Sequence, residues 1–400
     1  MTDVTLQDAA KASEKTREDE FPTDKIMTIV GGHFIHDTYT AFLAPMLPLL
    51  IDKLTLSLTQ ASSLSVFMQL AALFNVLIGL VADKMSLHYL VILAPAVTAT
   101  LMSAMGLVDG YLPLALLLTV AGISVSAFHV PAPAMIGYLS GRRVGRGMSL
   151  YMAGGEMGRS LGPILVAGAV GLWGFEGIWR LAIMGWATSA ILFLRFRHID
   201  AQPKQKQQRE SIREILPRVQ RLFIPLSMLM FLRYFLLSGV SIFLVVFLKD
   251  GGYSLAEASQ ALALWSFAGV AGALTGGTIS DTIGRKKTIV LAMISSGSLM
   301  TIFLNIEGWP LLPVLMLCGF TTLSIAPVLQ ATVLEQIPEQ RATANGLFMS
   351  LSFLLRSVVV LIVGIIGDAY GLETAYSIAV VLTFVAIPLV FMLPDLQKAE

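Results

Sequence analysis

Long apolar stretches recur along the chain, and short clusters of polar and charged residues separate them. A helix rises 1.5 Å per residue, so about 20 apolar residues cross a hydrocarbon core roughly 30 Å thick. Only helices and closed barrels satisfy their backbone polar groups in lipid, and these stretches are too long for barrel strands. The pattern predicts an all-α membrane protein with twelve transmembrane helices, at 26–51, 61–82, 87–107, 112–139, 147–171, 178–197, 222–248, 257–280, 287–306, 310–333, 343–367 and 374–393.

Composition excludes a soluble protein of this length. Hydrophobic residues make up 56% of the chain and charged residues 13%, whereas a soluble domain has about 25% charged residues. The net charge of +1 gives no reason to expect a nucleic-acid partner, and the single cysteine, Cys318, excludes an intramolecular disulfide. Residues 1–25 are polar and contain no apolar segment typical of a cleavable signal peptide, so we expect a cytoplasmic tail.

The distribution of lysine and arginine predicts the orientation in the membrane. Cytoplasmic segments carry an excess of these residues in membrane proteins. With the N-terminus in the cytoplasm, only Lys53, Arg180 and Lys249 fall in outer loops, and only Arg159, Arg233 and Arg356 fall inside spans. All the other lysines and arginines then lie on the cytoplasmic side. We therefore expect a multi-pass protein of the cell inner membrane with both termini in the cytoplasm.

The second half of the chain repeats the first. Residues 57–62 (Ser-Leu-Thr-Gln-Ala-Ser) return as residues 254–259 (Ser-Leu-Ala-Glu-Ala-Ser), an offset of 197 positions. At offsets of 197 or 198, Gly79, Asp83, Gly122, Arg159 and Ser160 return as Gly277, Asp281, Gly319, Arg356 and Ser357. The repeat predicts two pseudo-symmetric six-helix bundles, at 26–197 and 222–393, with a polar cytoplasmic linker at 198–221 and a short tail at 394–400.

A motif after the eighth span points to a family. The sequence Gly277-Thr278-Ile279-Ser280-Asp281-Thr282-Ile283-Gly284-Arg285-Lys286-Lys287 resembles the cytoplasmic loop motif of the major facilitator superfamily. The resemblance implies the major facilitator fold, alternating access to a central cavity, and a gating role for Gly79, Asp83, Gly277, Asp281, Gly284 and Arg285. The first-half copy lacks the later glycine and the basic pair, and a positively charged cluster that only sets topology would look similar.

The fifth span carries a second motif. The segment Gly154-Gly155-Glu156-Met157-Gly158-Arg159-Ser160-Leu161-Gly162-Pro163 resembles the helix-packing motif of proton-coupled drug antiporters, with Gly158, Gly162 and Pro163 at its defining positions. A plain small-residue packing face is the alternative. Together with the segment from Gly32 to Asp37 (Gly-His-Phe-Ile-His-Asp) and the pair Phe128-His129, this span resembles the fosmidomycin-resistance branch. That resemblance implies export of a drug or organic anion.

Ionisable residues inside the spans are candidates for proton coupling, because such residues are costly in a membrane. His33, His36 and Asp37 share one helical face, which can titrate. We name Asp37, His36 and Glu156 as the proton-coupling residues. Two alternatives stay open: Asp37 ionised permanently against a basic residue, and Glu156 neutralised by Arg159 three residues later.

Substrate recognition is predicted from the excess of arginine over acid inside the spans. The arginine side chain stays charged and presents a fork suited to carboxylate or phosphonate groups. The candidate substrate-binding residues are His33, Tyr39, His129, Arg159, Arg233, Tyr234 and Arg356. We therefore expect a small anionic or amphiphilic substrate, together with protons, for a transporter that acts as a monomer in the bilayer.

Other functions are less well supported by the sequence. It contains no Walker motif and no catalytic constellation, so we expect neither an enzyme nor a cofactor. A divalent metal-ion exporter is the chief alternative, with His33, His36, Asp37 and His129 as ligands. The neighbouring arginines would repel such a cation. A non-transporting receptor on a transporter scaffold is a third alternative.

Overall fold

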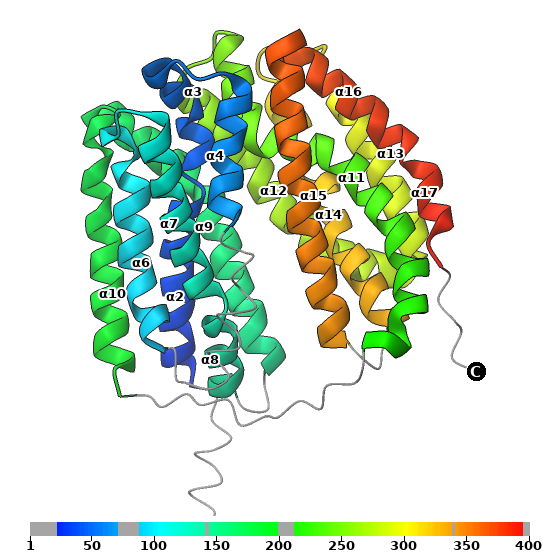
Figure 1. Ribbon diagram of the computed structural model, residues 1–400, viewed down its shortest axis with the longest axis horizontal. Helices are drawn as coiled ribbons and strands as arrows, with labels where there is room; N and C mark the ends of the chain where they lie inside the picture. Colours follow the sequence, from blue (N-terminus) through cyan, green and yellow to red (C-terminus); the bar gives the residue numbers. More distant parts are fainter. Residues whose placement is uncertain (1–21, 71–87, 141–143, 199–211, 338–340, 395–400) are drawn as a thin grey trace, which may run out of the picture.

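The computed structural model describes residues 22–70, 88–140, 144–198, 212–337 and 341–394. The N-terminal half contains α2 (Thr23–Thr40), α3 (Leu43–Leu54), α4 (Leu58–Leu70), α6 (His88–Ser103), η2 (Ala104–Leu107), α7 (Tyr111–His129), α8 (Pro131–Ser140), α9 (Val144–Trp173), η4 (Glu176–Leu181) and α10 (Ala182–Phe196). The C-terminal half contains α11 (Ile212–Asp250), α12 (Leu255–Ile283), α13 (Arg285–Phe303), α14 (Leu311–Gln336), α15 (Arg341–Tyr370), α16 (Leu372–Val385) and α17 (Ile387–Met392). The two halves stand side by side in Figure 1, the first in blue to green and the second in green to red.

The helices confirm the all-α prediction for the part of the chain that the structure describes. Ten helical segments there are long and apolar enough to cross a membrane. The fifth predicted span lies in the 30-residue helix α9, which is not one of these ten. Glu156 and Arg159 reduce its apolar character. The predicted second span, 61–82, begins within α4, and its remainder, with Gly79 and Asp83, lies outside the described residues.

In the N-terminal half, two of the predicted spans are each divided into two α-helices. The first divides into α2 and α3 around Ala41, and the fourth divides into α7 and α8 at Val130. Proline explains both breaks, because its ring clashes with the carbonyl group four residues earlier and it has no N–H to donate. Pro45 stands four residues after Ala41, and Pro131 opens α8.

Glycines allow pairs of helices to approach closely within each half. A Cβ atom at Gly158 of α9 would lie 2.2 Å from the carbonyl oxygen of Phe34 in α2, and one at Gly162 would lie 2.5 Å from that of Thr38. In the other half, a Cβ atom at Gly319 of α14 would lie 2.1 Å from a backbone oxygen of α12. These contacts leave no room for a larger residue, so α9 lies directly against α2 and α14 against α12.

The two halves are joined at the end of the molecule that the charge pattern assigns to the outside. Both carboxylate oxygens of Asp368, near the end of α15, accept backbone N–H groups at the start of α4, from Leu58 at 2.6 Å and from Thr59 at 2.8 Å. Lys249 of α11 donates to Asp52 of α3 at 2.7 Å. The helix ends that carry these contacts lie at the upper end of the molecule in Figure 1.

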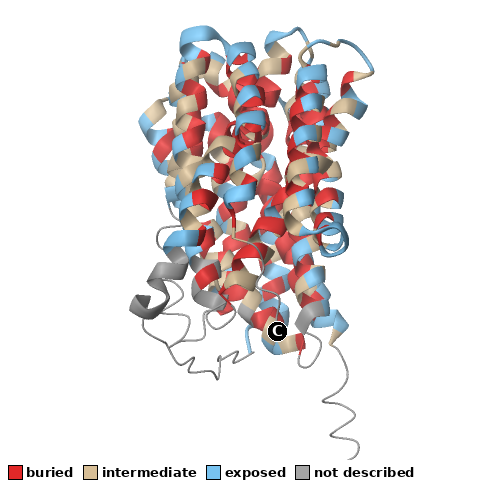
Figure 2. Cartoon of the chain, turned by 90° about the vertical axis from the view of Figure 1, so that its right-hand side faces the viewer, coloured by how far each residue is buried: buried red, intermediate tan, exposed pale blue. Residues whose placement is uncertain are grey.

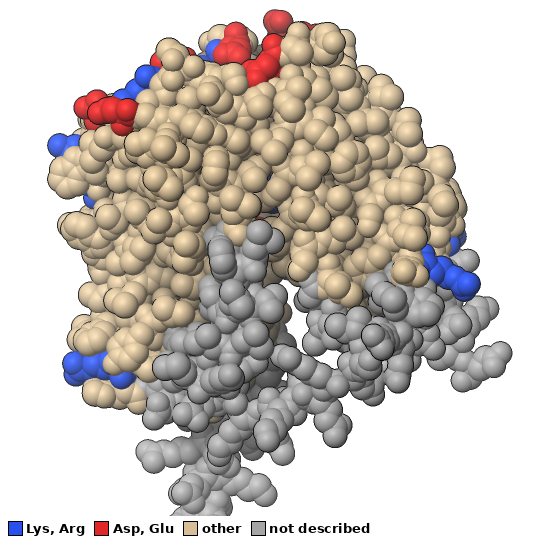
Figure 3. All heavy atoms as spheres, in the orientation of Figure 1, with Lys and Arg blue, Asp and Glu red and all other residues tan. Residues whose placement is uncertain are grey.

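The surface matches a bilayer environment. On the face shown in Figure 3, charged side chains gather at the upper edge and toward the lower edge, and the band between them is almost uncharged. Figure 2 shows buried residues in the interior of the bundle and exposed ones along its outer sides. Large apolar side chains such as Leu116, Leu194 and Leu274 point outward with more than half of their surface exposed. This arrangement suits helices surrounded by lipid.

Candidate transport site

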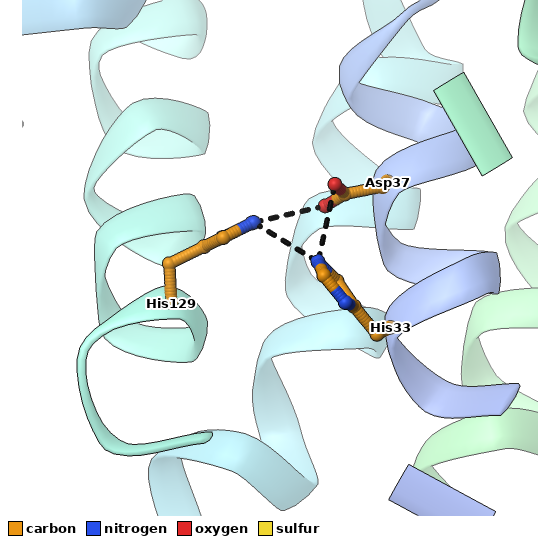
Figure 4. A group of neighbouring side chains, drawn as sticks. All are labelled: His33, Asp37 and His129. Carbon is orange, nitrogen blue, oxygen red and sulfur yellow. Dashed lines mark hydrogen bonds and ion pairs between the residues drawn. The ribbon is translucent and has the colours of Figure 1, made fainter. Parts of the chain in front are cut away.

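A buried carboxylate, Asp37, stands at the centre of a cluster of basic groups in the N-terminal half. His33 Nε2 lies 3.2 Å from Asp37 Oδ2, and His36 Nδ1 lies 3.2 Å from Asp37 Oδ1. His129, at the end of α7, places its Nε2 atom 3.2 Å from Oδ1 and 3.3 Å from His33 Nε2. Figure 4 shows His33, Asp37 and His129 converging from two helices. We call Asp37 and the three histidines the Asp37 centre.

Arg159 of α9 connects this centre to a second carboxylate. One guanidinium nitrogen donates to Asp37 Oδ2, and the other donates to Glu156 Oε1. Asp37 is completely buried, whereas the side chains of Arg159 and Glu156 are 39% and 36% exposed. The pairing of Glu156 with Arg159 is therefore present, and Asp37 also has a permanently charged partner. Both of the structural alternatives weighed from the sequence are compatible with these contacts.

Glycine makes the space in which the centre forms. A Cβ atom at Gly155 of α9 would lie 2.4 Å from His33 Cε1 and 2.9 Å from Asp37 Oδ2. Any larger residue would push the His33 ring away from the carboxylate. The small residues of the fifth span therefore do two things: Gly158 and Gly162 bring α9 against α2, and Gly155 leaves room for the polar cluster. Pro163 lies inside α9, one residue after Gly162.

Polar side chains that the sequence did not single out surround the centre. His36 Nε2 lies 3.1 Å from Thr98 Oγ1 of α6, and Thr98 donates to Ser124 Oγ of α7 at 2.8 Å. The His33 ring stacks on Tyr151 of α9 with a centroid distance of 3.9 Å. Serine, threonine and tyrosine are common in transmembrane helices. Nothing in the sequence distinguished these three residues from ordinary packing residues.

The C-terminal half supplies two arginines of a different kind. Arg233 of α11 is 3% exposed, and its Nη2 atom donates to the Thr322 carbonyl at 3.0 Å. Its Nε atom has no hydrogen-bond partner within the described part of the chain. Arg356 of α15 donates to Ser241 Oγ at 3.2 Å. Among the described residues, no ion pair of either arginine with a carboxylate is found, so both keep donor capacity for an anion.

Two predicted substrate contacts differ in their surroundings. Tyr234 of α11 is next to Arg233, whose guanidinium carbon lies 5.8 Å from the centre of the Tyr234 ring. Tyr39 is completely buried, and its hydroxyl donates to the Leu181 carbonyl at 2.5 Å. Its side chain therefore belongs to the interior of the N-terminal half, away from the arginines of the other half. We leave Tyr39 out of the proposed site.

The second-half loop motif forms a local network. Arg285, at the start of α13, contacts Asp281 at 2.6 Å and Glu335 of α14 at 2.6 Å. Gly284 has φ = 97°, a conformation that favours glycine and lets α12 turn into α13. A Cβ atom at the motif glycine Gly277 would meet open space. Its neighbour Gly276 makes the close contact instead, with a Ser324 backbone oxygen 2.6 Å from its Cβ position.

The geometry of the Asp37 centre does not favour a divalent metal ion. One ligand atom each of His33, Asp37 and His129 lies within 4.8 Å of the others. The guanidinium of Arg159 already bonds the Asp37 carboxylate, however, and a cation placed there would be repelled by it. We therefore assign none of these residues as a metal ligand.

Comparison with known proteins identifies the family of the chain. The sequence profile of the Major Facilitator Superfamily matches residues 29–272 and 226–400. The chain belongs to the Major Facilitator Superfamily. It is 24% identical over 373 residues to the fosmidomycin resistance protein of Escherichia coli (strain K12), covering 91% of each chain. It is 25% identical over 406 residues to an uncharacterized transporter of the superfamily, YfnC of Bacillus subtilis (strain 168), covering 98% of each.

Solved structures of superfamily transporters share the fold. A bacterial homologue of the human lysosomal transporter Spinster, inward-facing and unoccupied, superimposes with a TM-score of 0.78 at 13% identity, covering 93% of this chain and 97% of the other. A point mutant of the nucleoside transporter NupG gives 0.78 at 16% identity, covering 92% and 100%. These likenesses show the fold. Because the chain belongs to the Major Facilitator Superfamily, it is a membrane transporter and not an enzyme.

Proposed function

We propose that this transporter is a proton-coupled efflux antiporter for a small organic anion or drug, working by alternating access. The single observation that carries the proposal is the division of charge between the halves. The N-terminal half holds a buried group of titratable side chains around Asp37. The C-terminal half holds Arg233 and Arg356, which no carboxylate of the described chain neutralises. Protons would bind at the first and an anion at the second.

The closed outer end supports the direction of loading. In this conformation Asp368 and Lys249 hold the two halves together at the end assigned to the outside, so substrate would enter from the cytoplasm. Opening of the outer end would require both contacts to break. Export is also suggested by the relative from Escherichia coli, whose name describes resistance to a drug. We propose an inner-membrane location and action as a monomer.

The proposed orientation has its own test. A reporter that is active only in the cytoplasm should work when fused after residue 210, in the linker, or at residue 400. It should fail when fused after residue 109 or residue 251, which lie in expected outer loops. Activity after both residue 109 and residue 210 would contradict the twelve-span topology.

Transport can be tested with purified protein in proteoliposomes, with fosmidomycin as the probe. An imposed pH gradient should drive uptake of the probe into vesicles that are acidic inside, and addition of the probe should move protons in the opposite direction. Protons that moved together with the probe would refute antiport. Transport that did not respond to the gradient would refute proton coupling. If fosmidomycin is not transported, other drugs with a carboxylate or phosphonate group should be tried in the same assay. Divalent metal ions serve as the negative control.

A further inference from the structure

In two of the histidines of the Asp37 centre, the ring nitrogen that faces away from Asp37 is hydrogen-bonded to a backbone carbonyl. His33 Nδ1 lies 2.8 Å from the carbonyl oxygen of Tyr151, and His129 Nδ1 lies 3.0 Å from that of Val125. A carbonyl oxygen can only accept, so each of these nitrogens must carry a hydrogen. In the neutral ring the other nitrogen, Nε2, is then bare.

The third histidine is fixed by a chain of hydroxyl groups. Ser124 Oγ donates to the Ala94 carbonyl at 3.2 Å, so its only hydrogen is used there. Thr98 then donates its own hydrogen to Ser124 Oγ, and Thr98 Oγ1 is left to accept from His36 Nε2. This is the only direction in which every link is a hydrogen bond. The bare nitrogen of neutral His36 is therefore Nδ1.

All three bare nitrogens face the same carboxylate. His33 Nε2, His36 Nδ1 and His129 Nε2 each lie 3.2 Å from an oxygen of Asp37. With every histidine neutral and Asp37 ionised, lone pairs would face lone pairs in all three contacts. A contact of this kind becomes a hydrogen bond only when a proton lies between its two atoms, so the centre needs at least one additional proton.

The surrounding charges decide which side of the carboxylate takes that proton. The titratable and charged groups that face the centre are Tyr151, Glu156 and Arg159, all from α9. Arg159 donates to Oδ2, so that oxygen already has a cationic partner. Oδ1 is shared by His36 and His129 and has no such partner among the described residues. The proton belongs in the contacts around Oδ1.

We propose that the transported proton is shared between Asp37 Oδ1, His36 Nδ1 and His129 Nε2, and that Thr98 and Ser124 are positioning residues that hold His36 in the required tautomer. The role of this cluster in transport rests on the proposed proton coupling. The tautomers of the histidines follow from the hydrogen bonds alone. His129, which the sequence suggested as a substrate contact, becomes part of the proton site. The proton carrier is then a cluster in which three atoms share the proton, and not a single carboxylate.

Nitrogen-15 NMR of histidine-labelled protein in nanodiscs tests the tautomers directly. The chain has 5 histidines, so single substitutions can assign each signal. At alkaline pH we expect hydrogen on Nδ1 of His33 and His129 and on Nε2 of His36. A mixture of both His36 tautomers, or Nε2–H forms of His33 and His129, would overturn the proposal. This measurement needs no substrate, so it can fail or succeed independently of the proposed transport.

Thr98 provides the matched variants. Thr98→Val keeps the shape and removes the acceptor, and Thr98→Ser keeps the hydroxyl. In Thr98→Val the His36 tautomer should no longer be fixed, and Thr98→Ser should restore it. Thr119→Val is the control, because the Thr119 hydroxyl bonds the Ala115 carbonyl of its own helix. Unchanged His36 signals in Thr98→Val would show that the hydroxyl chain does not position the ring.

The pH profile of transport gives the second readout. Without the Thr98 hydroxyl, the Nε2–H group of the protonated His36 ring loses its hydrogen-bond acceptor. The midpoint of pH-driven transport should therefore move to lower pH, by about 0.5–1 unit, in Thr98→Val. Thr98→Ser and Thr119→Val should keep the wild-type midpoint. A Thr98→Val variant with fewer active molecules but the wild-type midpoint would assign Thr98 a purely structural role and refute the proposal.

Discussion

The contact between α9 and α2 at Gly158 can be tested by adding one methyl group. In Gly158→Ala the new Cβ atom would lie 2.2 Å from the Phe34 carbonyl oxygen and 3.1 Å from the Thr38 nitrogen. Carbon and oxygen normally approach to about 3.3–3.6 Å, so the helices must separate by roughly 1 Å. Both obstacles are backbone atoms, and no side-chain rotation can relieve the clash.

The separation should disrupt the Asp37 centre, because α2 carries His33 and Asp37 while α9 carries Tyr151 and Arg159. The hydrogen bond from His33 Nδ1 to the Tyr151 carbonyl is 2.8 Å long, and roughly 1 Å more removes it. Overpacking of this kind costs about 1–3 kcal/mol of stability. A shift of about 1 Å in an aligned polar site can lower its activity by roughly a hundredfold.

Thermal unfolding in detergent and pH-driven transport in proteoliposomes measure the two effects. Gly168→Ala and Gly171→Ala are matched controls on the same helix, because a Cβ atom at either position has nothing within 4 Å. Alanine is favoured over glycine in a helix by about 1 kcal/mol, so the controls should be as stable as the wild type or slightly more so. A Gly158→Ala protein with wild-type stability and transport would refute the close contact between α9 and α2.

Three further substitutions test the coupling, the anion site and the outer closure. Asp37→Asn keeps the size of the side chain and removes its titration, so pH-driven accumulation should be lost while exchange of bound substrate continues; full accumulation would exclude Asp37 from coupling. Arg233→Gln should weaken substrate binding about tenfold to a hundredfold, since a hydrogen bond to a charged group is lost, and Arg233→Lys should restore it poorly; an unchanged binding isotherm would make Arg233 structural. Asp368→Asn removes one of the two oxygens that accept N–H groups from the start of α4, so the outer end should open more readily. A cysteine introduced by Ser62→Cys, at a position buried against α15, should then react faster with an impermeant maleimide from outside. An unchanged rate would show that other contacts keep the outer end closed.

Much of the fold could be predicted from the sequence, because helices in lipid depend on apolar length. The interruptions at Ala41 and Val130 were harder to predict, since a proline inside a span can bend a helix without dividing it. The close approach of α12 to α14 lies at Gly276, one position before the motif glycine Gly277. Neighbouring residues on a helix point in directions that differ by roughly a quarter of a turn. The sequence does not say which of these directions meets another helix.

The candidate site was predictable only in part. His33 and Asp37 are four residues apart, so their contact follows from helical geometry. The contacts of Asp37 with His129 and Arg159 join three helices and depend on how α7 and α9 pack against α2. Thr98 and Ser124 could not be found, because a threonine or serine in a membrane helix usually bonds its own backbone.

The separation of the two charged centres has a consequence for how this transporter can change over time. The Asp37 centre and the side chains bonded to it belong to α2, α6, α7 and α9, whereas Arg233 and Arg356 belong to α11 and α15. Under the proposed function, substitutions beyond the linker would alter which compound is recognised and leave the proton site intact. New substrate specificities are then expected to arise in the second half of the gene. Chimaeras joined at the linker should take their proton coupling from one parent and their substrate from the other.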